Sequence, residues 1–201
     1  QLIRKAAEEA QASTQFLEFL HMALQVGNFI NNGAAENRKG TVRAFALESV
    51  QMLASCKAGP VSALHFMCLT LRSEDPTFAK SLKNSLLHTR EASREKLSML
   101  EADVASFSTE AQFVRRQLER FKEADEGRER VEKLAAEAES EDAELKRELA
   151  QSVCAVKEAQ AYFNVSVKEG SKPPAPEQFF GHIASIVENF QAAWAEAEQN
   201  D

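Results

Sequence analysis

Residues 109–163 constrain the fold most, because this stretch contains no proline and one glycine, Gly127. Its apolar residues recur at the spacing of one helix face, and glutamate, lysine and arginine fill most other positions. Because the apolar stripe is narrow, the helix should project from a globular part or form one arm of an antiparallel helix pair. We expect its weakest point at 124–128, where Gly127 could bend it. The apolar positions are Val114, Leu118, Phe121, Val131, Leu134, Ala138, Leu145, Leu149, Val153 and Val156.

Composition predicts an all-α protein with a real core. Of the 201 residues, 44% are apolar, and seven glycines and five prolines are few. This usage is typical of long helices, folded as one domain or as one compact half with an extended arm. No apolar run approaches the about 20 residues that span a bilayer, so no membrane partner is expected. Cys56, Cys68 and Cys154 lack Cys-x-x-Cys spacing, which indicates reduced thiols in an intracellular protein.

The pattern divides the chain into four parts. These are a compact helical subdomain at 1–88, a long helical arm at 89–169, a proline-rich linker at 170–176, and a C-terminal helix at 177–201 that packs back onto the long helix. Within the first part we expect a helix over 2–30, kinked near 12–14, and short helices at about 45–56 and 60–72, the second beginning at Pro60. A helix over 88–106 should be interrupted at 106–109, where Thr109 and Gln112 fit a capping box for a fresh start. Trp194 is expected in the core.

Gly27 lies within the last turns of the helix that ends near Ile30. A glycine inside a helix costs about 1 kcal/mol relative to alanine, so we expect another backbone or a bulky side chain to approach closely there. The alternative is that the helix ends early. The asparagines, glycines and charged residues of 31–41 predict an exposed loop.

Motifs for catalysis are missing from the sequence. It has no phosphate-binding glycine-rich loop, no Gly-x-Ser-x-Gly and no His-Glu-x-x-His. The histidines, at 21, 65, 88 and 182, lack the spacing of metal ligands. We therefore expect no enzyme activity, no metal site and no cofactor.

A basic segment, Arg-Lys-Gly-Thr-Val-Arg at 38–43, stands out in a chain of net charge −7. One interpretation is a solvated loop. The other is electrostatic steering toward an acidic protein surface, where rim charges raise association rates more than affinity. Nucleic acid is not expected as a partner, because no aromatic residues interleave with the basic ones.

Two segments in this region resemble the formin-homology-two domain, the actin-assembling core of formins. Residues 27–33, Gly-Asn-Phe-Ile-Asn-Asn-Gly, are similar to the family's Gly-Asn-Tyr-Met-Asn-x-Gly. Residues 44–49, Ala-Phe-Ala-Leu-Glu-Ser, are similar to its Gly-Phe-Lys-Leu-x-Ser, with Ala46 in place of the lysine. Weaker matches follow in the family's order: Leu-His-Phe at 64–66, Tyr-Phe at 162–163, and Pro-Glu-Gln-Phe-Phe at 176–180.

The resemblance implies a C-terminal, roughly half-sized part of that domain, without the lasso, linker and knob that precede it in the family. Two such domains form a ring in which the lasso of one subunit wraps the post of the other. The lasso-receiving residues would be Gly27, Asn28, Phe29, Asn31 and Gly33. Gly27 would admit the lasso, Asn28 and Asn31 could hydrogen-bond its backbone, and Phe29 would wall the pocket or equally belong to the core.

The resemblance also implies an actin contact. Its residues would be Arg38, Lys39, Arg43, Phe45, Ala46 and Leu47. Alanine at the lysine position implies a weaker or shifted contact, for which Lys39 or Arg43 could substitute. The parent protein would nucleate actin filaments and processively cap barbed ends as a dimer, in the cytoplasm at the cytoskeleton. Profilin would be reached only through segments outside this chain, and this fragment alone should not nucleate.

Two alternatives stay open. The long charged helix alone permits a helical coiled-coil scaffold or adaptor without actin activity. Self-association through an uncovered post is a further possibility, because exposed apolar grooves attract partners. A compact helical unit over 15–86 with Gly27 facing an open groove would favour the post.

Overall fold

The computed structural model describes residues 1–33, 42–59, 61–123, 126–163, 165 and 173–199. Helices dominate these residues, which confirms the predicted all-α class. The chain divides into two compact units. The globular unit contains 2–95 and 156–201, and the arm unit contains 96–155 with Gln1. The sequence pattern had placed the arm at 89–169 instead.

The globular unit begins with two helices, α1 (Leu2–Ala12) and α2 (Thr14–Asn32). Ser13 leaves the helical conformation, with ψ of 103°, and its Oγ accepts a hydrogen bond from the Phe16 N–H at 3.0 Å. The kink expected at 12–14 is therefore a helix boundary set by an N-cap. At the other end Gly33 adopts φ of 63° and donates its N–H to the Phe29 carbonyl at 2.8 Å, which terminates α2.

The segment after 41 forms short elements. A 3-10 helix, η1 (Leu47–Gln51), leads into α3 (Met52–Ser55). The strands β1 (Lys57–Ala58) and β2 (Val61–Ser62) then pair in an antiparallel hairpin. This hairpin separates α3 from α4 (Ala63–Glu74), whose N-cap is Ser62. Pro60, expected to begin that helix, lies outside the described residues.

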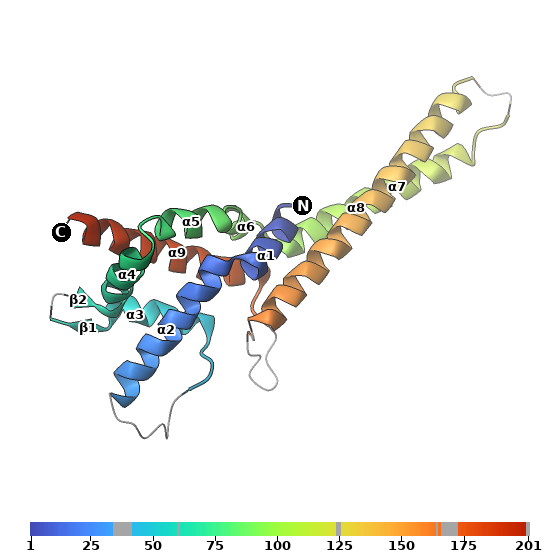
Figure 1. Cartoon of the computed structure of the whole chain (residues 1–201). Helices are drawn as coiled ribbons and strands as arrows, with labels where there is room; N and C mark the ends of the chain where they lie inside the picture. The colour runs from blue at the N-terminus through green and yellow to red at the C-terminus, as the bar shows by residue number, and fades with distance from the viewer. Residues whose placement is uncertain (34–41, 60, 124–125, 164, 166–172, 200–201) are drawn as a thin grey trace. The chain divides into compact units, whose positions relative to one another are not determined.

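Three further helices complete the globular unit: α5 (Phe78–Ser85), α6 (Thr89–Ala92) and α9 (Pro176–Gln199). In Figure 1, α9, coloured red, passes α4, α5 and α6, and it contacts all three and η1. This arrangement explains why α9 is apolar on so much of its surface. Near its beginning, Phe179 contacts Phe163, the residue that follows α8 (Arg128–Tyr162), with ring centroids 6.1 Å apart.

Aromatic rings form the centre of the core. The Phe190 ring lies 5.1 Å from that of Phe19, 6.0 Å from Phe78 and 5.6 Å from Trp194, measured between centroids. Trp194 is 5% exposed, which confirms its expected core position. The Cys68 thiol donates to the Phe190 carbonyl, and burial raises the pKa of that thiol to about 12. Burial of each such ring contributes about 1.5–3 kcal/mol.

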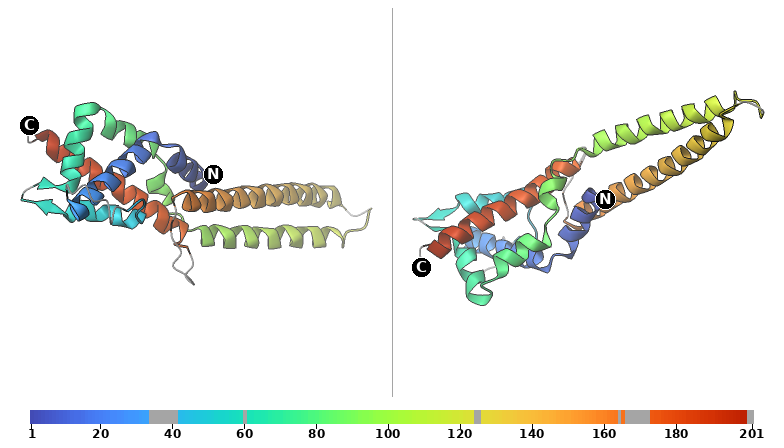
Figure 2. Two further views of the ribbon diagram at one scale, coloured as in Figure 1. Left: turned by 60° about the horizontal axis from the view of Figure 1, so that its bottom comes forward. Right: turned by 90° about the horizontal axis from the view of Figure 1, so that it is seen from above.

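The arm unit consists of α7 (Leu97–Leu118) and the part of α8 (Arg128–Tyr162) up to residue 155. The two helices run antiparallel and side by side (Figure 2). The prediction of one helix over 109–163 is wrong, because the chain leaves the helix after Leu118 and reverses, with Gly127 at φ of 92° just before α8. The predicted interruption at 106–109 is also wrong, since α7 runs through it.

A polar contact inside the arm explains why α7 continues there. The Ser108 hydroxyl donates to Oδ1 of Asp142 on α8, and Lys146 Nζ lies 2.7 Å from Oδ2 of the same carboxylate. These two hydrogen bonds, that of Lys146 first, lower the pKa of Asp142. Ser108 thus faces the partner helix rather than breaking its own. No helix in the described ranges is long and apolar enough to cross a membrane.

Candidate functional site

A groove of about 380 Å³ opens in the globular unit between the second half of α2 and residues 42–56. Side chains and backbone from both segments form its walls, and most of its lining is apolar. The lining residues are Ala23, Leu24, Gly27, Asn28, Ile30, Asn31, Val42, Phe45, Ser49, Val50, Met52, Leu53, Ser55 and Cys56.

One face of α2 provides the first wall. Ala23, Gly27, Ile30 and Asn31 recur at intervals of three and four residues and therefore share a face. A Cβ added to Gly27 would meet no heavy atom of the described residues within 4 Å, so the helix backbone is exposed to the groove at this point. The alternative that the helix ends early at Gly27 is wrong, because α2 continues to Asn32.

Two expected lasso residues lie elsewhere. Phe29 is 63% exposed and belongs neither to the groove lining nor to the core. At about 100° per residue it points about 200° away from Gly27, and Ile30 lines the groove instead. Gly33 is exposed and serves as the left-handed C-cap of α2, which is a structural role.

Residues 42–56 provide the second wall. Phe45 is half-buried and lines the groove, and Ala46 is the exposed N-cap of η1. Leu47, expected at an actin contact, is only 6% exposed and packs in the core, because its side chain points inward from the start of η1. Sequence reasoning missed the lining residues between 49 and 56. Met52 of this segment lines the groove and is 68% exposed, a feature that only the structure shows.

The sequence model of the Formin Homology 2 Domain matches residues 1–191. This chain belongs to the formin homology 2 family. It is similar to Formin-A of Dictyostelium discoideum, with 26% identity over 205 residues that cover 98% of this chain and 16% of the relative. It is also similar to FH2 domain-containing protein 1 of Mus musculus, with 30% identity over 106 residues that cover 52% of this chain and 9% of the relative. The chain thus spans less than a fifth of the length of either relative.

Asn28 of this formin homology 2 chain makes an internal contact. Its Nδ2 donates to the Val42 carbonyl and its Oδ1 accepts from the Val42 N–H, both at 2.9 Å. The amide expected to meet a partner's backbone is therefore engaged within the chain. Asn31 is exposed and lines the groove.

Charge beside the groove comes from Arg43, which is exposed. Arg38 and Lys39 lie outside the described residues. Glu48, on η1, pairs with His182 of α9, with 3.2 Å between Oε1 and Nδ1. Arg43 is thus a cationic group next to an apolar groove in a chain of net charge −7.

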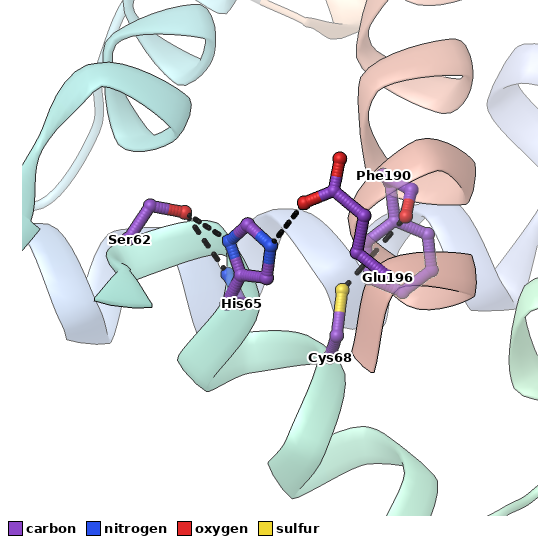
Figure 3. A network of polar contacts seen from close by, with 5 residues as sticks. All are labelled: Ser62, His65, Cys68, Phe190 and Glu196. Atoms are coloured by element: carbon purple, nitrogen blue, oxygen red, sulfur yellow. Dashed lines mark hydrogen bonds and ion pairs between the residues drawn. The ribbon is translucent and has the colours of Figure 1, made fainter. Parts of the chain in front are cut away.

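A second polar network joins α4 to α9 (Figure 3). Ser62 Oγ lies 2.7 Å from His65 Nδ1, and His65 Nε2 lies 2.8 Å from Glu196 Oε2. These residue types resemble a nucleophilic triad. However, Ser62 is 2% exposed and its hydroxyl caps α4 by accepting the His65 N–H at 3.2 Å. A substrate cannot reach this hydroxyl, so the network is a structural tie between two helices.

Proposed function

We propose that this chain is the post and arm of a formin homology 2 domain, and that its groove receives the lasso of a second subunit. The observation that supports this proposal best is the position of Gly27, which lies bare in the wall of an open, mostly apolar groove of about 380 Å³. A glycine in a helix is unfavourable unless its missing side chain is used. Here no heavy atom of the described residues comes within 4 Å of a Cβ placed on Gly27, as an incoming segment requires.

The lining chemistry supports an apolar anchor as the occupant. Small residues such as Ala23 and Ser49 leave room, while Phe45 and Leu53 offer apolar surface. Aromatic side chains bury large areas at low entropic cost and dominate such contacts, so an aromatic anchor of the lasso suits this groove.

We further propose that the protein carrying this chain acts in actin filament assembly at the cytoskeleton. As a dimer it would nucleate filaments and processively cap barbed ends in the cytoplasm. Arg43, exposed beside the groove, would steer association with the acidic surface of actin. Ala46 cannot supply the charge of the family's lysine, so we assign its role to Arg43 together with Lys39. Profilin would act through other segments, and no cofactor takes part.

Barbed-end elongation of fluorescent actin filaments tests this function. A longer chain with the lasso and knob upstream should remain at barbed ends and change their elongation rate, whereas the 201-residue chain alone should not. Alanine at Arg38, Lys39 and Arg43 together should slow association with barbed ends in the longer chain. An unchanged association rate would refute the compensating role of these basic residues.

The competing function is a helical scaffold without actin activity, which the antiparallel α7 and α8 of the arm would permit. The scaffold hypothesis assigns no use to the groove at Gly27. If the longer chain forms a folded dimer but leaves elongation unchanged, either alanine in place of the lysine at position 46 has abolished the actin contact or the scaffold function is the correct one.

A further inference from the structure

The side-chain amide of Asn28 pairs with both polar atoms of one peptide unit in the facing segment. Its Nδ2 donates to the Val42 carbonyl and its Oδ1 accepts from the Val42 N–H, each at 2.9 Å. This pairing resembles the exchange of two hydrogen bonds between residues on adjacent strands. This pairing requires a donor and an acceptor on one short side chain, and asparagine has both.

The pairing joins the two walls of the groove. Asn28 follows Gly27 on α2, while Val42 and Phe45 line the opposite wall. Among the described residues, these are the two hydrogen bonds that connect α2 with residues 42–46. Val42 is 47% exposed and Phe45 only half-buried, so apolar burial holds this wall weakly.

We propose that Asn28 is a positioning residue that holds the Val42 to Phe45 wall in place, so that the groove exists before its occupant arrives. Asn28 also lines the groove, but both polar atoms of its amide are engaged by Val42, so it acts through Val42. A groove that is formed in advance spares the occupant the entropy of ordering it, which raises affinity. This inference rests on the proposed function only where it names the lasso as the occupant.

The binding experiment uses the 201-residue chain and a fluorescein-labelled peptide with the lasso sequence typical of the formin family. Fluorescence anisotropy gives Kd for the wild type and for Asn28→Ala. We expect about a tenfold higher Kd, equivalent to about 1.4 kcal/mol, because two hydrogen bonds are lost. Gln25→Ala is the matched control, since Gln25 is an exposed amide on α2 outside the groove that bonds to His21. Its Kd should equal that of the wild type.

Asn28→Asp adds a readout that a purely structural role would not change. At neutral pH the carboxylate has no donor for the Val42 carbonyl, so binding should weaken as in Asn28→Ala. A protonated carboxyl has both a donor and an acceptor, like the amide it replaces. The ratio of the variant's Kd to the wild-type Kd should therefore fall toward one as the pH drops toward about 4, near the usual pKa of aspartate.

Cysteine alkylation tests the position of the wall without any peptide. Cys56 lines the groove and is half-buried, whereas the exposed Cys154 of the arm provides an internal standard. With iodoacetamide and mass spectrometry, Asn28→Ala should label Cys56 about fivefold faster relative to Cys154. An unchanged ratio of these rates, or a Kd equal to that of Gln25→Ala, would overturn the positioning role.

Different results would contradict the lasso site and the positioning role of Asn28. If the peptide does not bind the wild type, the groove is not the lasso site, and alkylation of Cys56 still decides whether Asn28 holds the wall. If the peptide binds the wild type and Asn28→Ala equally well, the proposed function stands and the positioning role is wrong.

Discussion

Replacing Gly27 by leucine should raise the stability of the fold and weaken lasso binding at the same time. The residue lies inside α2, and a Cβ there would meet no heavy atom of the described residues within 4 Å, so the first atom of the new side chain enters the groove without a clash. Glycine is about 0.8–1 kcal/mol less favourable than alanine in a helix interior, and leucine is nearly as good as alanine. The free energy of unfolding should therefore rise by about 0.8 kcal/mol.

The binding side of this prediction follows from the groove volume of about 380 Å³. A branched side chain in its wall excludes an aromatic anchor, and such anchors contribute about 2 kcal/mol or more to an interface. We expect Kd for the lasso peptide to rise at least about thirtyfold.

Urea unfolding followed by circular dichroism and anisotropy with the lasso peptide measure the two effects. Gly27→Ala is the control, because it should give the stability gain with less obstruction of the groove. A leucine variant that binds like the wild type would refute the assignment of Gly27 to the lasso path. A leucine variant that is less stable would show that the space above Gly27 is filled.

Three further predictions concern the core, the arm and the cysteines. Phe190→Ala, at a fully buried ring, should lower the free energy of unfolding by about 3–5 kcal/mol in urea titrations. The pKa of Asp142 is lower in the folded chain than in the unfolded chain, so its stabilising effect is present above the unfolded pKa and is lost as the pH falls through the folded pKa. The circular dichroism signal at 222 nm should therefore decrease less in acid for Asp142→Asn than for the wild type. At pH of about 8, iodoacetamide should label Cys56 and Cys154 but label Cys68 only after unfolding, since burial raises the pKa of Cys68 to about 12; labelling of Cys68 in the folded chain would contradict its burial.

The local sequence was sufficient to predict features that depend on a single helix or its cap. The sequence predicted a kink at 12–14, where the Ser13 hydroxyl caps a new helix, and the apolar face of the last helix predicted Trp194 in the core. Sequence was misleading at 106–109, where a serine and threonine cluster is typical of a helix end. Ser108 instead pairs with Asp142, a residue 34 positions away that the local pattern cannot reveal.

Some residues of the candidate site could also be predicted from the sequence, whereas others could not. The motifs near Gly27 lie on the part of α2 that lines the groove, but helix phase excludes Phe29 from the lining and places Ile30 in it. The burial of Leu47 could not be predicted from the sequence, because it depends on the packing of η1 against α9.

By itself the sequence determined the helical class, the family and the location of the bare glycine, because periodicity, composition and short motifs are local properties of the chain. Only the tertiary structure decided which side chains face the groove, that residues 42–56 form its second wall, and that Asn28 holds Val42. These features depend on contacts between segments that are distant along the chain. The free energy of such contacts exists only once both segments are folded and packed together.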